Sequence, residues 1–233
     1  MPRFIFRITH AENVPRYLEE GLIRAKGIPP TQFGYRVSDQ NIISRRGDSI
    51  STRIGFPVNN YVPFYFSPLT TMAMSIAYGN VPVLDPRGRE IGDSSSDQMA
   101  FIVAQVDLVA NHCNYKFTSA ACNTAIPPAV YDDISLLEQA VNWGLFDDGA
   151  IKGAIPEINY PGSTRFCSDS DKSVRYHNRK KERMAEFMVH REFPMELTCA
   201  IVTSNRAARV SLEAEALRLG YTINVLHKPD CFF

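Results

Sequence analysis

The chain has 233 residues, of which 45% are hydrophobic and 11% aromatic. This is enough apolar material for one substantial core, so we predict a single domain over residues 1–233. Lys plus Arg and Asp plus Glu number 25 each, so the net charge of zero excludes attraction of nucleic acid by the overall field and leaves only local basic patches. The five cysteines have no CxxC spacing, which argues against a zinc site and a disulfide framework. No apolar run is long enough to cross a bilayer. Together these features predict a soluble cytoplasmic protein.

The first predicted elements place a histidine at the end of a strand. Residues 3–9 alternate polar and apolar side chains, as in a strand that ends at His10. Asn13 then caps a short helix, Pro15 belongs to its first turn, and Gly21 ends it. His10 therefore lies where residues that face a ligand are often found, although a histidine hydrogen bonded to a neighbouring loop would have the same sequence signature.

An aromatic strand follows a long loop. Residues 27–60 contain Gly, Pro and four arginines with little periodicity, and we expect them to be mostly loop. Residues 61–68, YVPFYFSP, predict a strand that carries Tyr61 and Tyr65 on the same face. Such a strand is most often core, but its second aromatic face can also stack on a flat ligand ring. A helix is predicted over residues 70–78.

The remaining pattern indicates an α+β fold. Residues 85–97 form a polar insert that we expect to be mobile, and a helix over 205–219 begins after Ser204. The apolar face predicted for this helix carries Val210, Ala214 and Leu217. Further strands are expected over 99–109, 115–118, 185–190, 199–203 and 222–226, with short helical segments in 131–145. Scattered short strands with few helices favour an α+β fold over a parallel βαβ array.

A dense basic segment runs directly into one of these strands. Six of the twelve residues from Lys172 to Arg183 are Lys or Arg, against the single acid Glu182, which is typical of a surface that contacts a polyanion. The strand that follows begins near Glu186, and we expect this carboxylate to project into a cleft beside the bound polyanion. The alternative is that Glu186 is a solvated surface residue and the basic segment a solvated loop.

Several common catalytic motifs are absent from the sequence. It contains no GxxxxGK[ST] loop, no GxGxxG between a strand and a helix, no HExxH and no nucleophile elbow. These absences argue against P-loop phosphoryl transfer, Rossmann redox chemistry and zinc hydrolysis.

The order of the motifs carries a family resemblance. THxxNxP at residues 9–15 is followed by an arginine pair, then by YVPFYFSPLTTMAMSI, RxAEFxV and a terminal HKPxxFF. From Thr9 to Phe233 the chain resembles the DarT family of DNA ADP-ribosyltransferase toxins, the partners of DarG antitoxins. The resemblance implies an ADP-ribosyltransferase fold with two small packed β-sheets, flanking helices, and NAD as a substrate in the cleft between the sheets, without a metal.

The resemblance also implies which residues form the site. Glu186 takes the catalytic position, and the family's essential upstream arginine is Arg46, with Arg53 as its competitor. The residues implied to bind NAD are His10, Asn13, Tyr61, Tyr65, Ser67, Met74 and Arg53. The loop over residues 156–184 faces the acceptor, and its implied nucleic-acid contacts are Arg175, Tyr176, His177, Arg179, Lys180, Lys181 and Arg183.

The implied function is transfer of ADP-ribose from NAD to a base of single-stranded DNA, with thymine favoured and guanine possible, in a cell protected by a DarG-type antitoxin. Two alternatives stay open at this stage. One is the same fold acting on RNA or protein, and the other is a nucleic-acid binding module without catalytic activity. Cleavage of NAD by the purified chain distinguishes the second from the others.

Overall fold

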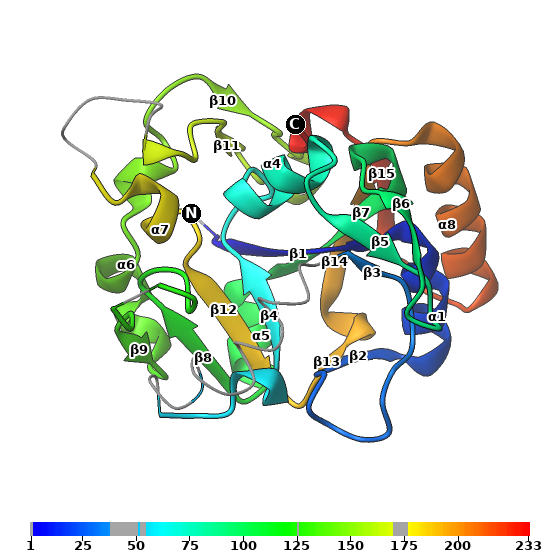
Figure 1. The fold of residues 1–233 in the computed structure, drawn as a ribbon, viewed down its shortest axis with the longest axis horizontal. Coiled ribbons are helices and arrows are strands. Elements are labelled where there is room, and N and C mark those ends of the chain that lie inside the picture. The colour runs from blue at the N-terminus through cyan, green and yellow to red at the C-terminus, as the bar shows by residue number, and fades with distance from the viewer. Residues whose placement is uncertain (1, 38–50, 52–54, 125, 170–176) are drawn as a thin grey trace.

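The computed structural model describes residues 2–37, 51, 55–124, 126–169 and 177–233. Its centre is an eight-stranded sheet with the strand order β15-β14-β7-β1-β4-β12-β8-β9 (Figure 1). The strands of this sheet are β1 (Phe4–His10), β4 (Tyr61–Tyr65), β7 (Met99–Gln105), β8 (Tyr115–Thr118), β9 (Val130–Tyr131), β12 (Glu186–His190), β14 (Thr198–Thr203) and β15 (Asn224–His227). All neighbouring strands run antiparallel except β14 and β15, which are parallel.

The sheet consists of two four-stranded halves that meet at one point. In the register of β1 and β4, the Cα partners are Phe6 and Tyr65, whereas β1 pairs with β7 over its whole length. Arg7 donates from Nη1 to the carbonyl oxygen of Pro63 at 3.0 Å and so spans the two strands beside that pairing. The expected pair of small sheets is therefore present as two halves that share one point of the hydrogen-bonded ladder.

Alternation along β4 follows the sequence pattern. Val62 and Phe64 are buried, whereas Tyr61, Pro63 and Tyr65 are half-buried on the other face. β7 is buried at every position but its last because both of its faces are covered, and its long apolar run reflects this. The predicted strand over 99–109 ends earlier than expected, since the helix α5 begins directly after Gln105.

Helices and smaller sheets cover this centre. The helices are α1 (Val14–Glu20), α4 (Thr71–Ala77), α5 (Val106–His112), α6 (Leu137–Ala140), α7 (Arg179–Glu182) and α8 (Arg206–Arg218). The smaller sheets pair β2 (Leu22–Arg24) with β13 (Glu192–Pro194), β10 (Ile151–Lys152) with β11 (Ser163–Thr164), and β3 (Arg36–Val37) with β5 (Pro82–Leu84) and β6 (Glu90–Asp93). Short 3-10 turns lie at Ala11–Asn13, Val58–Asn60, Ser96–Gln98, Ile134–Leu136, Trp143–Leu145, Pro156–Ile158, Met195–Leu197 and Pro229–Cys231.

The helix α8 buries a different face from the one predicted. Leu212 and Ala216 are its buried residues, whereas Val210 and Leu217 are 55% and 68% exposed. Its cap is Asn205, whose side chain accepts from the N–H groups of the second and third helical residues, rather than Ser204. The only large apolar residues of the helix are Val210, Leu212 and Leu217, so a three-residue pattern could not decide which face meets α1 and the sheet.

The polar insert over residues 85–97 contains a strand that the sequence did not predict. Its middle part forms β6, which pairs with β5 in a hairpin. The turn of this hairpin is held by Asp85, whose carboxylate accepts from the main-chain N–H groups of Arg87 and Arg89 at 2.9 Å each. These bonds and the adjacent Arg89 guanidinium hold the pKa of Asp85 below its usual range.

Candidate active site

Glu186 is the first residue of β12 and lies in the middle of the sheet. Its Cα partner on β4 is Tyr65, the same residue that pairs with Phe6 of β1. The carboxylate therefore lies at the junction of the two halves. Glu186 is 1% exposed, so the expectation of a solvated surface residue does not hold. A buried carboxylate requires hydrogen-bond donors, and the neighbouring loop provides one.

The end of β8 and the loop after it hold Glu186 at two points. The main-chain N–H of Cys122 donates to Oε1 of Glu186 with an N to O distance of 3.2 Å. Thr118, the last residue of β8, accepts from the main-chain N–H of Glu186 at 3.1 Å and donates to the carbonyl oxygen of Ala120 at 2.7 Å. Sequence analysis missed both residues, because nothing in an isolated Thr or Cys signals a contact with a strand that follows more than sixty residues later.

His10 ends β1 as predicted and stacks on a second aromatic ring. Its ring lies 4.5 Å from that of Tyr35 with an interplanar angle of 17°. Nδ1 of His10 accepts from the main-chain N–H of Glu12 at 3.3 Å, which leaves Nε2 to carry the proton. Burial lowers the pKa of His10, so the ring is neutral at neutral pH.

Asn13 is the N-cap residue of α1, and its side chain is hydrogen bonded to the loop at Tyr35. Its amide nitrogen donates to the carbonyl oxygen of Tyr35 at 2.8 Å and to Oγ1 of Thr9 at 3.2 Å. Its amide oxygen accepts from the N–H of Tyr35, also at 2.8 Å. A β-carbon on Gly34 would lie 2.5 Å from this oxygen, so a larger residue there would displace the Asn13 side chain. Asn13 occupies the predicted N-cap position of α1, with Pro15 in the first turn, but its side chain makes no capping hydrogen bond. Direct contact of Asn13 with NAD stays a prediction.

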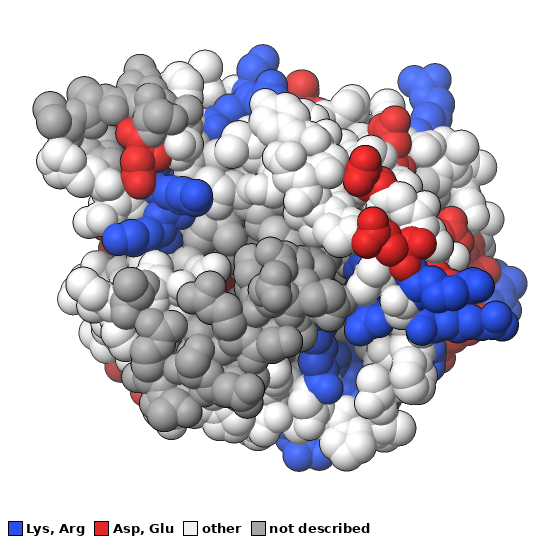
Figure 2. Space-filling model, viewed as in Figure 1, with Lys and Arg blue, Asp and Glu red and all other residues white. Residues whose placement is uncertain are grey.

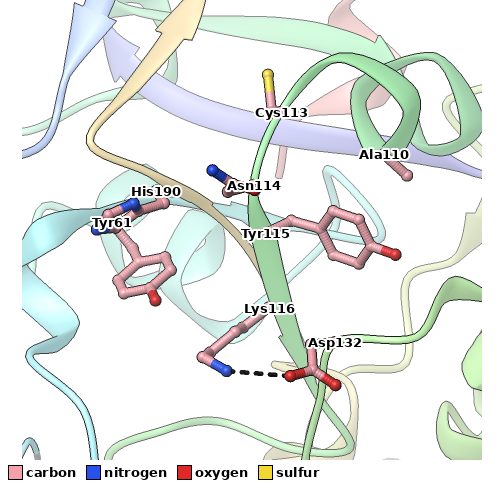
Figure 3. Close-up of a pocket in the computed structure, with 8 residues that line it drawn as sticks. All are labelled: Tyr61, Ala110, Cys113, Asn114, Tyr115, Lys116, Asp132 and His190. Atoms are coloured by element: carbon pink, nitrogen blue, oxygen red, sulfur yellow. Dashed lines mark hydrogen bonds and ion pairs between the residues drawn. The ribbon is translucent and has the colours of Figure 1, made fainter.

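The residues predicted on β4 divide between the two ends of the strand. Tyr65 lies beside Glu186, whereas Tyr61 pairs with His190 at the far end of β12, roughly 13 Å away at the usual rise per residue. There Tyr61 and His190 line a separate pocket of about 450 Å³. Figure 3 shows these two side chains next to each other across the pocket from the ion pair of Lys116 and Asp132, which is 3.5 Å long. Tyr61 thus lies apart from the site at Glu186.

Ser67 and Arg183 meet in a buried polar cluster. Nη2 of Arg183 donates to the carbonyl oxygens of Leu69 and Thr164 at 2.6 and 3.0 Å and to Oγ of Ser67 at 3.3 Å. The guanidinium lies over the ring of Phe146 at 4.3 Å, and burial lowers the pKa of Arg183 to about 10, so it remains charged at neutral pH. Arg183 is 0% exposed. The expectation that Arg183 contacts nucleic acid is therefore replaced by a structural role.

Arg179 has the same inward orientation. It is 1% exposed, forms an ion pair with Asp148 and donates to the carbonyl oxygen of Phe166 at 3.4 Å. The expected phosphate contact of Arg179 is therefore also wrong for this structure. Lys180, Lys181 and His177 are exposed, and Figure 2 shows basic side chains on the molecular surface at the place of α7. The basic segment thus has internal anchors and an outward-facing part.

The remaining predicted residues are less constrained. Met74 lies in α4 and is half-buried. Arg46, Arg53, Arg175 and Tyr176 lie outside the described residues, so their predicted roles stay predictions. Within the described ranges, no group of three or more His, Cys, Asp or Glu side chains is arranged to hold a metal ion. No helix of the described residues is long and apolar enough to cross a membrane.

Comparison with known proteins identifies the family. The family model described as "ssDNA thymidine ADP-ribosyltransferase, DarT" matches residues 6–233. The chain belongs to the DarT family. It is therefore an enzyme of the NAD-dependent DNA ADP-ribosyltransferase class, and NAD is its substrate, as the motif order predicted. The alternative of a binding module without catalytic activity is thereby set aside.

Relatives and solved structures agree with the DarT assignment. The chain is 23% identical over 232 residues to a DNA ADP-ribosyl transferase of Escherichia coli O127:H6, covering 98% of this chain and 93% of the relative. Its fold matches Thermus sp. 2.9 DarT in complex with ADP-ribosylated ssDNA, with a TM-score of 0.75, 18% identity and coverage of 100% and 97% of the two chains. The complex of Thermus sp. 2.9 DarT with NAD⁺ matches with a TM-score of 0.69, 16% identity and coverage of 100% and 98%. The predicted ADP-ribosyltransferase fold is confirmed.

Proposed function

We propose that this DarT-family protein transfers ADP-ribose from NAD to a ring nitrogen of thymine in single-stranded DNA. The proposal rests mainly on the carboxylate of Glu186, which is held at the junction of the two sheet halves. Shortly before Glu186 in the sequence lies α7, whose lysines are exposed. The description of the matching family names thymidine, and the Thermus relative was solved with ADP-ribosylated ssDNA, which supports this acceptor.

The proposed chemistry uses one side chain as a base. The bond between nicotinamide and ribose C1 breaks, nicotinamide leaves with the bonding electrons, and the ribose develops oxocarbenium character. The ring nitrogen of thymine attacks C1 while Glu186 removes its proton, because the protonated nitrogen is a poor nucleophile. Arg46, or Arg53 in its place, stabilises the developing charge or the NAD phosphates.

We assign the remaining predicted residues to the two substrates. His10, through its neutral ring, and Tyr65 contact NAD, with Asn13, Ser67 and Met74 supporting that side of the cleft. On the acceptor side, Lys180 and Lys181 contact phosphates and His177 stacks on a base, together with Arg175 and Tyr176. Tyr61, at the far end of β12, has the weakest support among the NAD-binding residues.

Labelled NAD tests the donor and the acceptor together. The purified protein is incubated with NAD labelled in its adenylate group and with single-stranded oligonucleotides of each base, double-stranded DNA, RNA of the same sequence, and a protein mixture. We expect label on single-stranded DNA that contains thymine, and no label with Glu186→Gln. Label on guanine-only strands would move the target base, and label confined to RNA or protein would reject the DNA acceptor.

We further propose that the protein acts as a toxin with an antitoxin partner of the DarG type and works in the cytoplasm, where NAD and replicating DNA are both present. The fold also matches Thermosipho africanus DarTG in complex with ADP-ribose, with a TM-score of 0.64. The match includes 99% of this chain and 51% of the Thermosipho chain. Modified template bases would block replication. Expression without an antitoxin should arrest growth, and normal growth in the presence of modified DNA would contradict the proposal.

A further inference from the structure

Arg183 extends the pairing of β4 and β12 beyond the carboxylate of Glu186. The antiparallel register of the two strands ends with the pair that contains Glu186. Continued three residues further, this register brings Arg183 opposite Pro68. In place of a main-chain pair, Nη2 of Arg183 donates to the residues on either side of Pro68, to the carbonyl oxygen of Leu69 at 2.6 Å and to Oγ of Ser67 at 3.3 Å. The side chain therefore continues the contact of the two strands where their backbone pairing has ended.

The segment that Arg183 holds is the β4–α4 turn, residues 67–70. This turn is closed by its own hydrogen bonds, from the N–H of Leu69 to Oγ of Ser67 at 3.1 Å and from the N–H of Thr70 to the carbonyl oxygen of Pro68 at 3.2 Å. Thr70 then caps α4 through its side chain. Because the turn is compact and continuous with both elements, a bond to its carbonyl oxygen fixes the end of β4 and the start of α4 together.

The same nitrogen of Arg183 also holds a third segment. It donates to the carbonyl oxygen of Thr164 in β11 at 3.0 Å, and Oγ of Ser163 lies 2.6 Å from Oγ of Ser67. Arg183 is itself the C-cap residue of α7. β11 and α7 both belong to the loop over residues 156–184, which we expect to face the acceptor. One guanidinium thus connects this loop to the β4–α4 turn.

A charge at this buried position has to be offset by its hydrogen bonds. Arg183 is 0% exposed, and burial opposes the charged form of the guanidinium, lowering the pKa of Arg183 to about 10. The hydrogen bonds of Nη2 all go to oxygens of other segments. They therefore determine where these segments lie relative to the first residues of β12.

On the basis of the transfer reaction proposed above, we propose that Arg183 is a positioning residue that fixes the β4–α4 turn, on the NAD side of the cleft, against Glu186. In this role Arg183 contacts neither substrate. It acts through the place of Glu186 relative to Tyr65 and Met74, which lie in the elements on either side of the turn. A displacement of about 1 Å between reacting groups can lower a rate by about 10²-fold. Loss of the arginine should therefore lower kcat rather than the affinity for either substrate.

Steady-state kinetics with NAD and a thymine-containing single strand test this role, with rates expressed per folded molecule from thermal unfolding. Arg183→Met retains an unbranched side chain but donates no hydrogen bond. It should lower kcat by roughly 10²-fold and leave the KM values for both substrates within about threefold. Arg183→Lys, which can donate to some of the same oxygens, should have a kcat roughly tenfold above that of Arg183→Met.

Arg179→Met is the matched control. Arg179 is equally buried and lies in the same helix, but its partners Asp148 and the carbonyl oxygen of Phe166 lie outside the β4–α4 turn. Its kcat per folded molecule should stay within about twofold of the wild type.

Wild-type kcat in both Arg183 variants overturns the positioning role, as does a loss confined to KM or an equal loss of kcat in Arg179→Met. In each of these cases the wild type still transfers ADP-ribose, so the proposed function stands. If Arg183→Met does not fold, Arg183→Lys decides, because a kcat roughly tenfold below the wild type supports the role and a wild-type kcat overturns it. A wild type that modifies none of the strands overturns the transfer reaction, and the positioning role with it.

Discussion

The main-chain N–H of Cys122 donates a hydrogen bond of 3.2 Å to Oε1 of Glu186. A hydrogen bond to a carboxylate is stronger than one between neutral groups and fixes its orientation. Because this donor belongs to the backbone, no substitution at Cys122 other than proline removes it, and the position of the loop determines the position of the carboxylate. The geometry of the site therefore depends on how the loop after β8 packs.

Glu186→Gln should reduce transfer by about 10²- to 10⁴-fold, because the amide cannot remove a proton from the acceptor base. The protein should remain folded, since Gln retains an oxygen that can accept from Cys122. Transfer is measured with labelled NAD and a thymine-containing strand, and folding by thermal unfolding. Wild-type rates from a correctly folded variant would contradict the assignment of Glu186.

Thr118→Val should lower kcat by roughly tenfold with little change in the KM for NAD. Valine retains the shape of threonine but loses the hydroxyl that accepts from the N–H of Glu186 and donates to the carbonyl oxygen of Ala120. Thr118→Ser should restore most of the activity, since it restores the hydroxyl. Steady-state kinetics on all three proteins give the comparison. Equal losses in Val and Ser would show that Thr118 contributes only packing.

Local patterns in the sequence were sufficient to predict the place of the main catalytic candidate. The strand over 185–190 and the basic segment before it are continuous in the sequence, and the alternation of YVPFYF predicted which residues share a face of β4. His10 at the end of β1 followed from the same kind of pattern. These features depend on neighbouring residues, which a single sequence displays directly.

The orientation of the arginines could not be predicted in the same way. Arg179 and Arg183 are as basic as their lysine neighbours in the sequence, yet they point inward because acceptors from remote segments meet them. Those acceptors include Asp148 and the carbonyl oxygens of Leu69 and Thr164. Their meeting is a consequence of the tertiary fold, as is the contact of the 119–128 loop with Glu186.

Arg183→Ala should lower the free energy of unfolding by about 2–3 kcal/mol, because it leaves buried carbonyl oxygens without a donor and removes the contact with Phe146. Urea unfolding measures this change. Lys180→Ala, a substitution of an exposed residue in the same segment, is the control and should stay within about 0.5 kcal/mol of the wild type. Equal stability of the two variants would mean that Arg183 is not an anchor.

Replacing Lys180 and Lys181 together by Ala should weaken binding of single-stranded DNA and reduce its salt dependence. Each phosphate contact contributes about 0.7 to the slope of log affinity against log salt, so the slope should fall by roughly 0.7–1.4. Filter binding or fluorescence anisotropy at several salt concentrations gives the slope. The matched control is the double variant Arg87→Ala/Arg206→Ala, which removes two exposed charges, one between β5 and β6 and one at the start of α8. Figure 1 shows these elements on the other side of the molecule from α7. An effect of the same size in both double variants would indicate a general charge effect.

His10 should make the protein less stable as the solution becomes acidic. Burial lowers the pKa of His10 in the folded state below its ordinary value of 6.5, so the unfolded chain binds this proton more readily than the folded one. The contribution of the neutral ring is fully present above pH 6.5 and is lost as the pH falls through the lower folded-state pKa, with a slope of at most about 1.4 kcal/mol per pH unit.

His10→Gln removes the imidazole that binds this proton. The free energy of unfolding should therefore depend less on pH between 8 and about 5. The difference between the two curves isolates His10 from the other histidines, which both proteins retain. Urea unfolding at intervals of half a pH unit measures it. Since the acceptor role of Nδ1 requires the neutral ring, the affinity for NAD should fall over the same range in the wild type. Parallel stability curves for the two proteins would show that His10 titrates equally in both states and would refute the assignment of a buried neutral ring.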